Sequence, residues 1–105
     1  MTIHKGEQYA IPFAIKVSDD DVTPENVSGV RIQIGDLMCE YPEGQLQFDS
    51  VGGTWMYPLT EEQSYRMYAG VMPTQVAVKY GGDIVMSDII TVSVRDSIIQ
   101  KRWTE

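Results

Sequence analysis

The chain has 105 residues, of which 43% are hydrophobic and 22% charged, so it is long enough for one domain with its own core. Eight Lys and Arg against 15 Asp and Glu leave a net charge of −7, which argues against a general binder of nucleic acid or anionic membranes, because such binders neutralise phosphates. A single cysteine excludes an internal disulfide framework, and we expect neither a signal peptide nor a membrane span, because no apolar run suits either.

The first half of the chain alternates between apolar and polar residues, which is typical of half-buried strands. We predict a strand over residues 9–17, with an irregularity at Pro12 because proline cannot donate to a sheet ladder. A polar loop is expected over residues 18–29. Further strands are expected over residues 30–34, 37–41, 46–48 and 55–59, separated by turns that contain glycine or proline.

One segment departs from this alternation and predicts a single helix over residues 61–68. Thr60 and Gln63 have the spacing of a capping box. The two glutamates after Thr60 would lie in the first turn, where the helix dipole favours negative charge. Gly70 can supply the left-handed residue that ends the helix.

The second half of the chain returns to strand patterns. A strand over residues 75–80 leads into a hairpin turn at Gly81-Gly82-Asp83, and a β-rich run follows over residues 84–94. We therefore predict an all-β protein, an antiparallel β-sandwich over residues 1–95 with one short helical turn and a C-terminal tail over residues 96–105; a small closed barrel is the alternative. The predicted core consists of Phe13, Ile15, Ile32, Ile34, Val76, Val78, Ile90 and Val92.

Residues capable of catalysis or metal binding form no recognisable set in the sequence. His4, the only histidine, has no cysteine or carboxylate at ligand spacing, and Cys39 has no local base. The run Asp19–Asp21 lacks the further oxygen ligands and the glycine of an EF-hand loop, so a solvated loop tip is favoured over a calcium site. The preference for negative charge in the first turn of a helix explains the presence of Glu61 and Glu62 without a catalytic role. We expect no enzymatic activity, no cofactor and no bound metal.

Five motifs follow one another in order along most of the chain: VRIQI at 30–34, LTEEQS at 59–64 with Gly70, QVAV at 75–78, GDIVMS at 82–87 and VSV at 92–94. In this order and spacing, over roughly residues 2–99, the chain resembles small immunoglobulin-like domains encoded by tailed phages and prophages of Gram-positive bacteria. The resemblance implies an immunoglobulin-like sandwich and a non-catalytic role in the tail, baseplate or capsid region of the virion. It implies no functional residues, because the matching positions are structural.

Three functions remain open at this point. The leading hypothesis is a structural or accessory protein that is made in the host cytoplasm, is located in the virion and docks to other virion proteins. It would form a homo-oligomer or multi-copy assembly and contact neither nucleic acid nor membrane directly. The alternative is an acidic inhibitor of a host nucleic-acid-binding defence protein, whose carboxylates would imitate phosphates. The third is a carbohydrate-binding module for host adsorption, suggested by six tyrosines and two tryptophans.

The C-terminal tail is the candidate partner-binding site. Its candidate residues are Ile98, Ile99, Lys101, Arg102 and Trp103. The predicted fold is complete at Val94, and tryptophan and arginine are enriched at interface hot spots, so we predict that the tail is an assembly contact. In the alternative interpretation, Ile98 and Ile99 cap the bottom of the sandwich and Trp103 frays.

Overall fold

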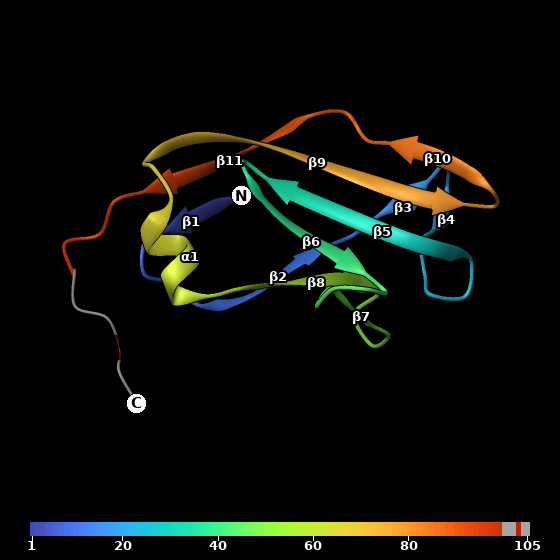
Figure 1. The fold of residues 1–105 in the computed structure, drawn as a ribbon, viewed down its shortest axis with the longest axis horizontal. Helices are drawn as coiled ribbons and strands as arrows, with labels where there is room; N and C mark the ends of the chain where they lie inside the picture. The colour runs from blue at the N-terminus through green and yellow to red at the C-terminus, as the bar shows by residue number, and fades with distance from the viewer. Residues whose placement is uncertain (100–102, 104–105) are drawn as a thin grey trace.

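The computed structural model of the chain describes residues 1–99 and 103, which form eleven strands and one short helix (Figure 1). The protein is all-β, as the alternation of its residues predicts. The elements are β1 (Thr2–His4), β2 (Tyr9–Phe13), β3 (Lys16–Val17), β4 (Asp20–Asp21), β5 (Val27–Ile34), β6 (Leu37–Tyr41), β7 (Gln47–Asp49), β8 (Thr54–Leu59), α1 (Glu61–Arg66), β9 (Gly70–Tyr80), β10 (Asp83–Met86) and β11 (Ile90–Arg95).

The strands form a larger and a smaller sheet that enclose the core between them. The larger sheet has the order β1-β11-β9-β5-β6, and β10 pairs with β9 beyond the end of β11. The smaller sheet has the order β2-β8-β7, and β3 and β4 form a separate short hairpin. β1 runs parallel to β11, whereas the other described pairings are antiparallel. Figure 1 shows α1 at one end of the two layers and β10 at the other.

β5 illustrates how the sequence produces these layers. Val30, Ile32 and Ile34 are buried, whereas Arg31 and Gln33 between them are exposed. Successive side chains of a strand point to opposite faces of the sheet, so an alternating sequence buries one face and leaves the other in water. The central position of β5 between β9 and β6 then places its inward row in the middle of the core.

Most of the predicted core is confirmed. The buried members are Phe13, Ile32, Ile34, Val76, Val78 and Val92, and Ile15 is half-buried and packs against them. The prediction for Ile90 is wrong, because its side chain is 49% exposed. Ile90 lies opposite the buried Thr74, so its side chain is on the inner face of the sheet, as predicted. However, Ile90 is the first residue of β11 and lies at the margin of the sheet, because β1 pairs only with residues 93–95 and does not cover it.

The segment before β5 differs from the predicted long strand and polar loop. β2 ends at Phe13, and β3 leaves it to pair with β4, which lies inside the segment expected to be a loop. Val22 directly after β4 is buried: its N–H donates to the carbonyl of Ile15 at 3.0 Å, and its carbonyl accepts from the indole Nε1–H of Trp55 at 2.9 Å. This pair of bonds fixes the hairpin to the core.

The helix forms where the capping box predicts it but ends two residues early. The Thr60 side chain accepts from the backbone N–H of Gln63, and the Gln63 side chain accepts from the backbone N–H of Thr60. Helix α1 stops at Arg66, because Met67 takes extended backbone and inserts its buried side chain into the core. Gly70, with φ of 134°, therefore begins β9 and does not end the helix.

Candidate interaction surfaces

The C-terminal tail leaves β11 and contacts helix α1. The hydroxyl of Tyr65 donates to the carbonyl of Ile99 at 3.2 Å, and the backbone N–H of Trp103 donates to Oε2 of Glu61 at 3.0 Å. Both partner residues belong to α1, so the helix holds the described part of the tail at this end of the domain. Glu62, the other acidic residue of the first turn, forms an ion pair with Arg66 at 2.6 Å.

The apolar side chains of the tail point away from the domain. Ile98 is 99% exposed, Trp103 is 88% exposed and Ile99 is also exposed, so neither isoleucine caps the end of the domain. Lys101 and Arg102, the two basic residues of the candidate site, lie outside the described residues. The tail thus presents apolar groups to solvent where a partner could cover them, and its role as an assembly contact stays a prediction.

A second apolar surface, which the sequence analysis missed, is the β10 edge, defined here as residues 83–90. Among the described strands, β10 pairs with β9 alone, and β1 stops short of it along the same margin. Its exposed apolar side chains are Ile84, Val85, Met86, Ile89 and Ile90. Consecutive apolar residues in a strand are typical of a strand buried on both faces, so the sequence alone does not indicate that these side chains are exposed.

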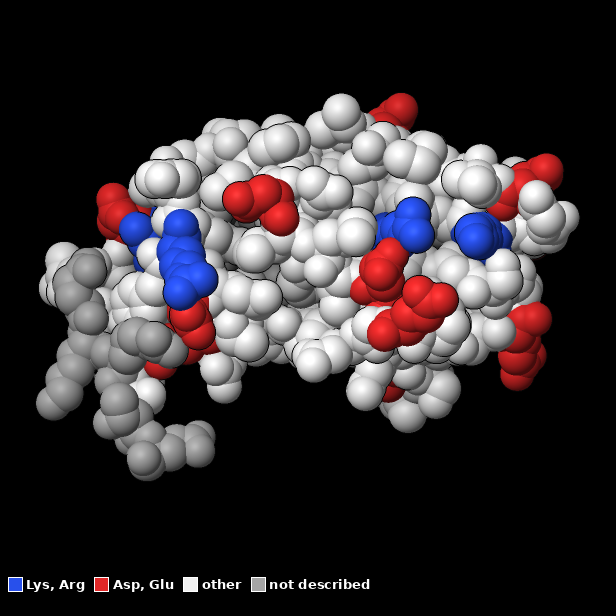
Figure 2. All heavy atoms as spheres, in the orientation of Figure 1, with Lys and Arg blue, Asp and Glu red and all other residues white. Residues whose placement is uncertain are grey.

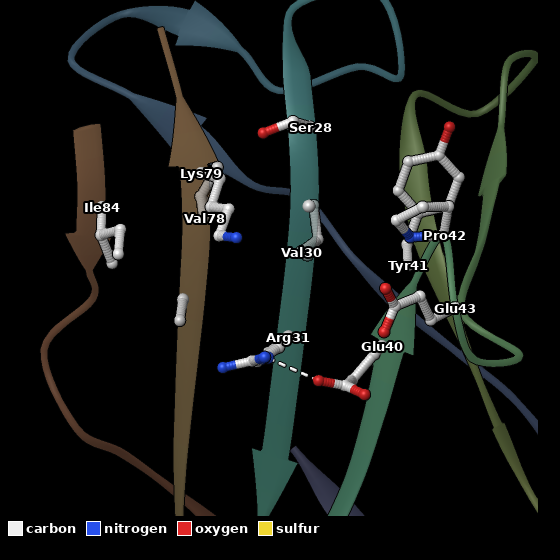
Figure 3. A pocket seen from close by; sticks show the side chains of 12 residues that line it. Ser28, Val30, Arg31, Glu40, Tyr41, Pro42, Glu43, Val78, Lys79 and Ile84 are labelled. Carbon is white, nitrogen blue, oxygen red and sulfur yellow. Dashed lines mark hydrogen bonds and ion pairs between the residues drawn. The ribbon is translucent and has the colours of Figure 1, made fainter. Parts of the chain in front are cut away.

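A shallow hollow lies beside the β10 edge on the outer face of the larger sheet (Figure 3). Arg31 on β5 and Glu40 on β6 line the hollow and form an ion pair, and Lys79 and Ile84 line it as well. Its volume of about 120 Å³ is smaller than the roughly 300–1,000 Å³ of typical ligand pockets. The hollow therefore extends the outer face of the β10 edge and is too small for a typical small-molecule site.

The residues with catalytic or metal-binding potential lie apart from one another. His4 Nδ1 lies 3.4 Å from the Glu7 carboxylate, and Asp20 accepts from the Tyr80 hydroxyl at 3.2 Å. Cys39 is half-buried, and this burial raises the pKa of its thiol, which favours the unreactive protonated form. Across residues 1–99 and 103, no group of three or more His, Cys, Asp and Glu side chains is placed to hold a metal ion.

Charged side chains on the face shown in Figure 2 form separate small groups. Several acidic side chains there lie directly beside basic ones, and broad uncharged areas separate the groups. The negative net charge is therefore not gathered into a continuous acidic strip on this face.

The buried Tyr57 gives the fold a testable dependence on alkaline pH. Burial, followed by the charge of Cys39, raises the pKa of Tyr57 to about 12, from about 10 in an unfolded chain. Above pH 10 the unfolded chain loses this proton first, so the stability contributed by neutral Tyr57 is complete below pH 10 and is lost between pH 10 and 12. The expected loss is at most about 3 kcal/mol, measured by urea unfolding across this range.

Tyr57→Phe is the matched control for this titration, because it keeps the ring and removes the ionisable hydroxyl. Its unfolding free energy should fall much less over the same pH range. An equal fall in both proteins would show that other groups cause the alkaline destabilisation.

No family model matches the chain, and neither a curated protein nor a solved structure matches it. Within the described residues, no helix is long and apolar enough to cross a membrane.

Proposed function

We propose that the chain is a non-enzymatic structural or accessory protein of a phage particle that acts by docking to other virion proteins. The observation that carries this proposal is the presence of two exposed apolar surfaces, the tail and the β10 edge. Figure 1 shows β10 at one end of the domain, and β11 runs toward the other end, where the tail begins. A protein with a contact surface at each end can connect two neighbours in an assembly.

The physical support for docking is the cost of leaving such surfaces in water. Proteins usually protect an unpaired strand edge with lysine, proline, a bulge or a covering loop, because it otherwise pairs with other chains. The β10 strand itself, with the sequence DIVM, contains neither lysine nor proline. Its exposed aliphatic side chains would gain free energy from burial against a partner.

The assignment to a virion follows from the family resemblance of the five ordered motifs. The immunoglobulin-like grouping is part of this proposal, and the two facing sheets are compatible with it. The carbohydrate-binding hypothesis loses two of its aromatic residues, because Trp55 and Tyr57 are buried and cannot stack on sugars, and it rests on the exposed rings of Tyr9, Tyr68 and Trp103. The inhibitor hypothesis also receives less support, because the face shown in Figure 2 carries no continuous acidic strip that could imitate a row of phosphates.

Purified phage particles provide the test. If the proposal is correct, an antibody against the chain should label the particles, and mass spectrometry should find the chain in a fixed copy number per particle. Its absence from particles would contradict the proposal. In that case, displacement of nucleic acid from a host protein would indicate the inhibitor, and retention on cell-wall polysaccharide would indicate the carbohydrate-binding module.

A further inference from the structure

The backbone of β10 has hydrogen-bonding groups directed away from its own sheet. Tyr80 and Asp83 flank the two-residue turn of the β9–β10 hairpin, which makes them a hydrogen-bonded pair. The backbone N–H of Ser87 donates to the carbonyl of Val76 on β9 at 2.8 Å. Ser87, four residues after Asp83, therefore also directs its backbone groups toward β9. The intervening residues alternate, so the N–H and C=O groups of Ile84 and Met86 point to the open side.

The side chains of this strand are apolar on both faces of the sheet. Ile84 lies opposite Lys79 and Met86 lies opposite Ala77, which places both on the outer face beside the hollow of Figure 3. Val85 lies opposite the buried Val78 and therefore lies on the inner face. Ile84 is 70% exposed, and Val85 and Met86 are exposed as well, so a strand added here would bury apolar surface above and below the sheet.

We propose that the occupant of the β10 edge is a second copy of this chain, joined by antiparallel pairing of the two β10 strands around a two-fold axis at Val85. This proposal rests on the docking function above and names its partner. Ile84 of each copy pairs with Met86 of the other, so that every outward N–H and C=O group of these two residues finds a partner. The two Val85 side chains face each other across the axis.

The charges next to β10 are compatible with this register. Antiparallel pairing around Val85 places Asp83 opposite Ser87 of the second copy and Asp88 opposite Gly82. No two carboxylates are directly opposed, although each chain carries a net charge of −7. On the outer face, Ile84 and Met86 of both copies form one apolar cluster, and on the inner face the two Val85 side chains form another.

Charge substitutions at the two-fold axis test the proposal directly. In sedimentation experiments the purified wild-type chain should form a dimer whose fraction rises with protein concentration. Val85→Lys alone and Val85→Glu alone should each be monomeric, because each places like charges opposite one another. An equimolar mixture of the two variants should regain the dimer, because only the mixed pair brings opposite charges together. A partner other than a second copy would not produce this rescue.

Variants at Met86 keep the test decisive if a charge at Val85 disturbs folding. Met86→Pro removes an outward N–H that β9 does not use, whereas Met86→Ala removes the side chain and keeps that N–H. The proline variant should dimerise about tenfold more weakly than the alanine variant, since each dimer loses two hydrogen bonds. Circular dichroism should show the same β-structure in both variants.

Salt distinguishes a second copy from a basic partner. Because both copies are acidic, raising the salt concentration should strengthen the dimer by screening their repulsion.

Two outcomes would overturn the proposal. One is a wild-type chain that is monomeric at every concentration, and the other is equal dimerisation of wild type, Val85→Lys, Val85→Glu and Met86→Pro. These results are independent of particle composition: a monomeric chain found in particles would refute the pairing alone, and a dimer absent from particles would refute the virion role alone.

Discussion

Replacing Ile32 with alanine is expected to lower the free energy of unfolding by about 2–4 kcal/mol. Ile32 is fully buried on β5, with Val76 on one neighbouring strand and Cys39 on the other. The substitution removes three carbon atoms from a position where strands on both sides prevent the structure from collapsing into the space. Urea unfolding, followed by tryptophan fluorescence or circular dichroism, measures the loss.

Ile90→Ala is the matched control, because it makes the same substitution at a residue of the same inward phase. Ile90 lies at the margin of the larger sheet and is about half exposed, so its truncation should cost less than about 1 kcal/mol when measured at low protein concentration. Equal losses for the two variants would show that the inward row of β5 does not form the centre of the core.

Removing residues 101–105 is expected to leave the melting temperature nearly unchanged and to abolish incorporation of the protein into particles. The described tail residues contribute little to the core, since Ile98, Ile99 and Trp103 are exposed. The deletion also removes the bond from the Trp103 backbone to Glu61, a single contact at the surface of α1. Thermal unfolding and immunodetection in purified particles are the two measurements.

A single substitution, Trp103→Ala, separates the side chain from the length of the tail. It keeps the backbone N–H that Glu61 accepts and removes the exposed ring, so it should reduce incorporation without changing the melting temperature. Unfolding of the shortened protein would show that the tail belongs to the core. Normal incorporation of the shortened protein would show that the tail is not an assembly contact.

The parts of the fold that could be predicted from the sequence are those determined by local patterns. The alternation of apolar and polar residues in VRIQI predicts both the strand β5 and which of its side chains point inward. Only adjacent residues are needed for this prediction, because successive side chains of a strand point to opposite faces. The capping box of Thr60 and Gln63 depends on residues three apart. The Gly81-Gly82 turn depends on two adjacent residues with positive φ, of 58° and 90°.

The features that were missed depend on distant parts of the chain. Ile3 is fully buried in β1, a three-residue strand whose formation requires β11. Val22 lies in a polar segment and is buried because the indole of Trp55 holds its carbonyl. The exposure of Ile90 depends on how far β1 extends along the sheet margin.

Of the two candidate interaction surfaces, the sequence predicted the tail but not the β10 edge, because only the tail is evident from local sequence. Apolar residues beyond the last predicted strand indicated the tail directly, because the sequence offered them no strand to pair with. The β10 edge required the topology. The side chains of Ile84 and Met86 are exposed on the outer face of the larger sheet, and their outward backbone groups are open because β1 pairs only with residues 93–95. Hydrophobicity alone does not distinguish a strand at such a margin from one in the interior.

The parallel pairing of β1 with β11 also sets the order in which the molecule can fold. Thr2 pairs with Ser93 and His4 with Arg95, so the two partners of this contact are separated by about ninety residues of chain. Closing so long a loop costs conformational entropy before any contact repays it, and such non-local pairings slow folding. During synthesis, β1 leaves the ribosome before β11 and has no partner in the larger sheet until β11 has followed. Ile3, which is buried in β1, therefore cannot take its place in the larger sheet until β11 has been synthesised.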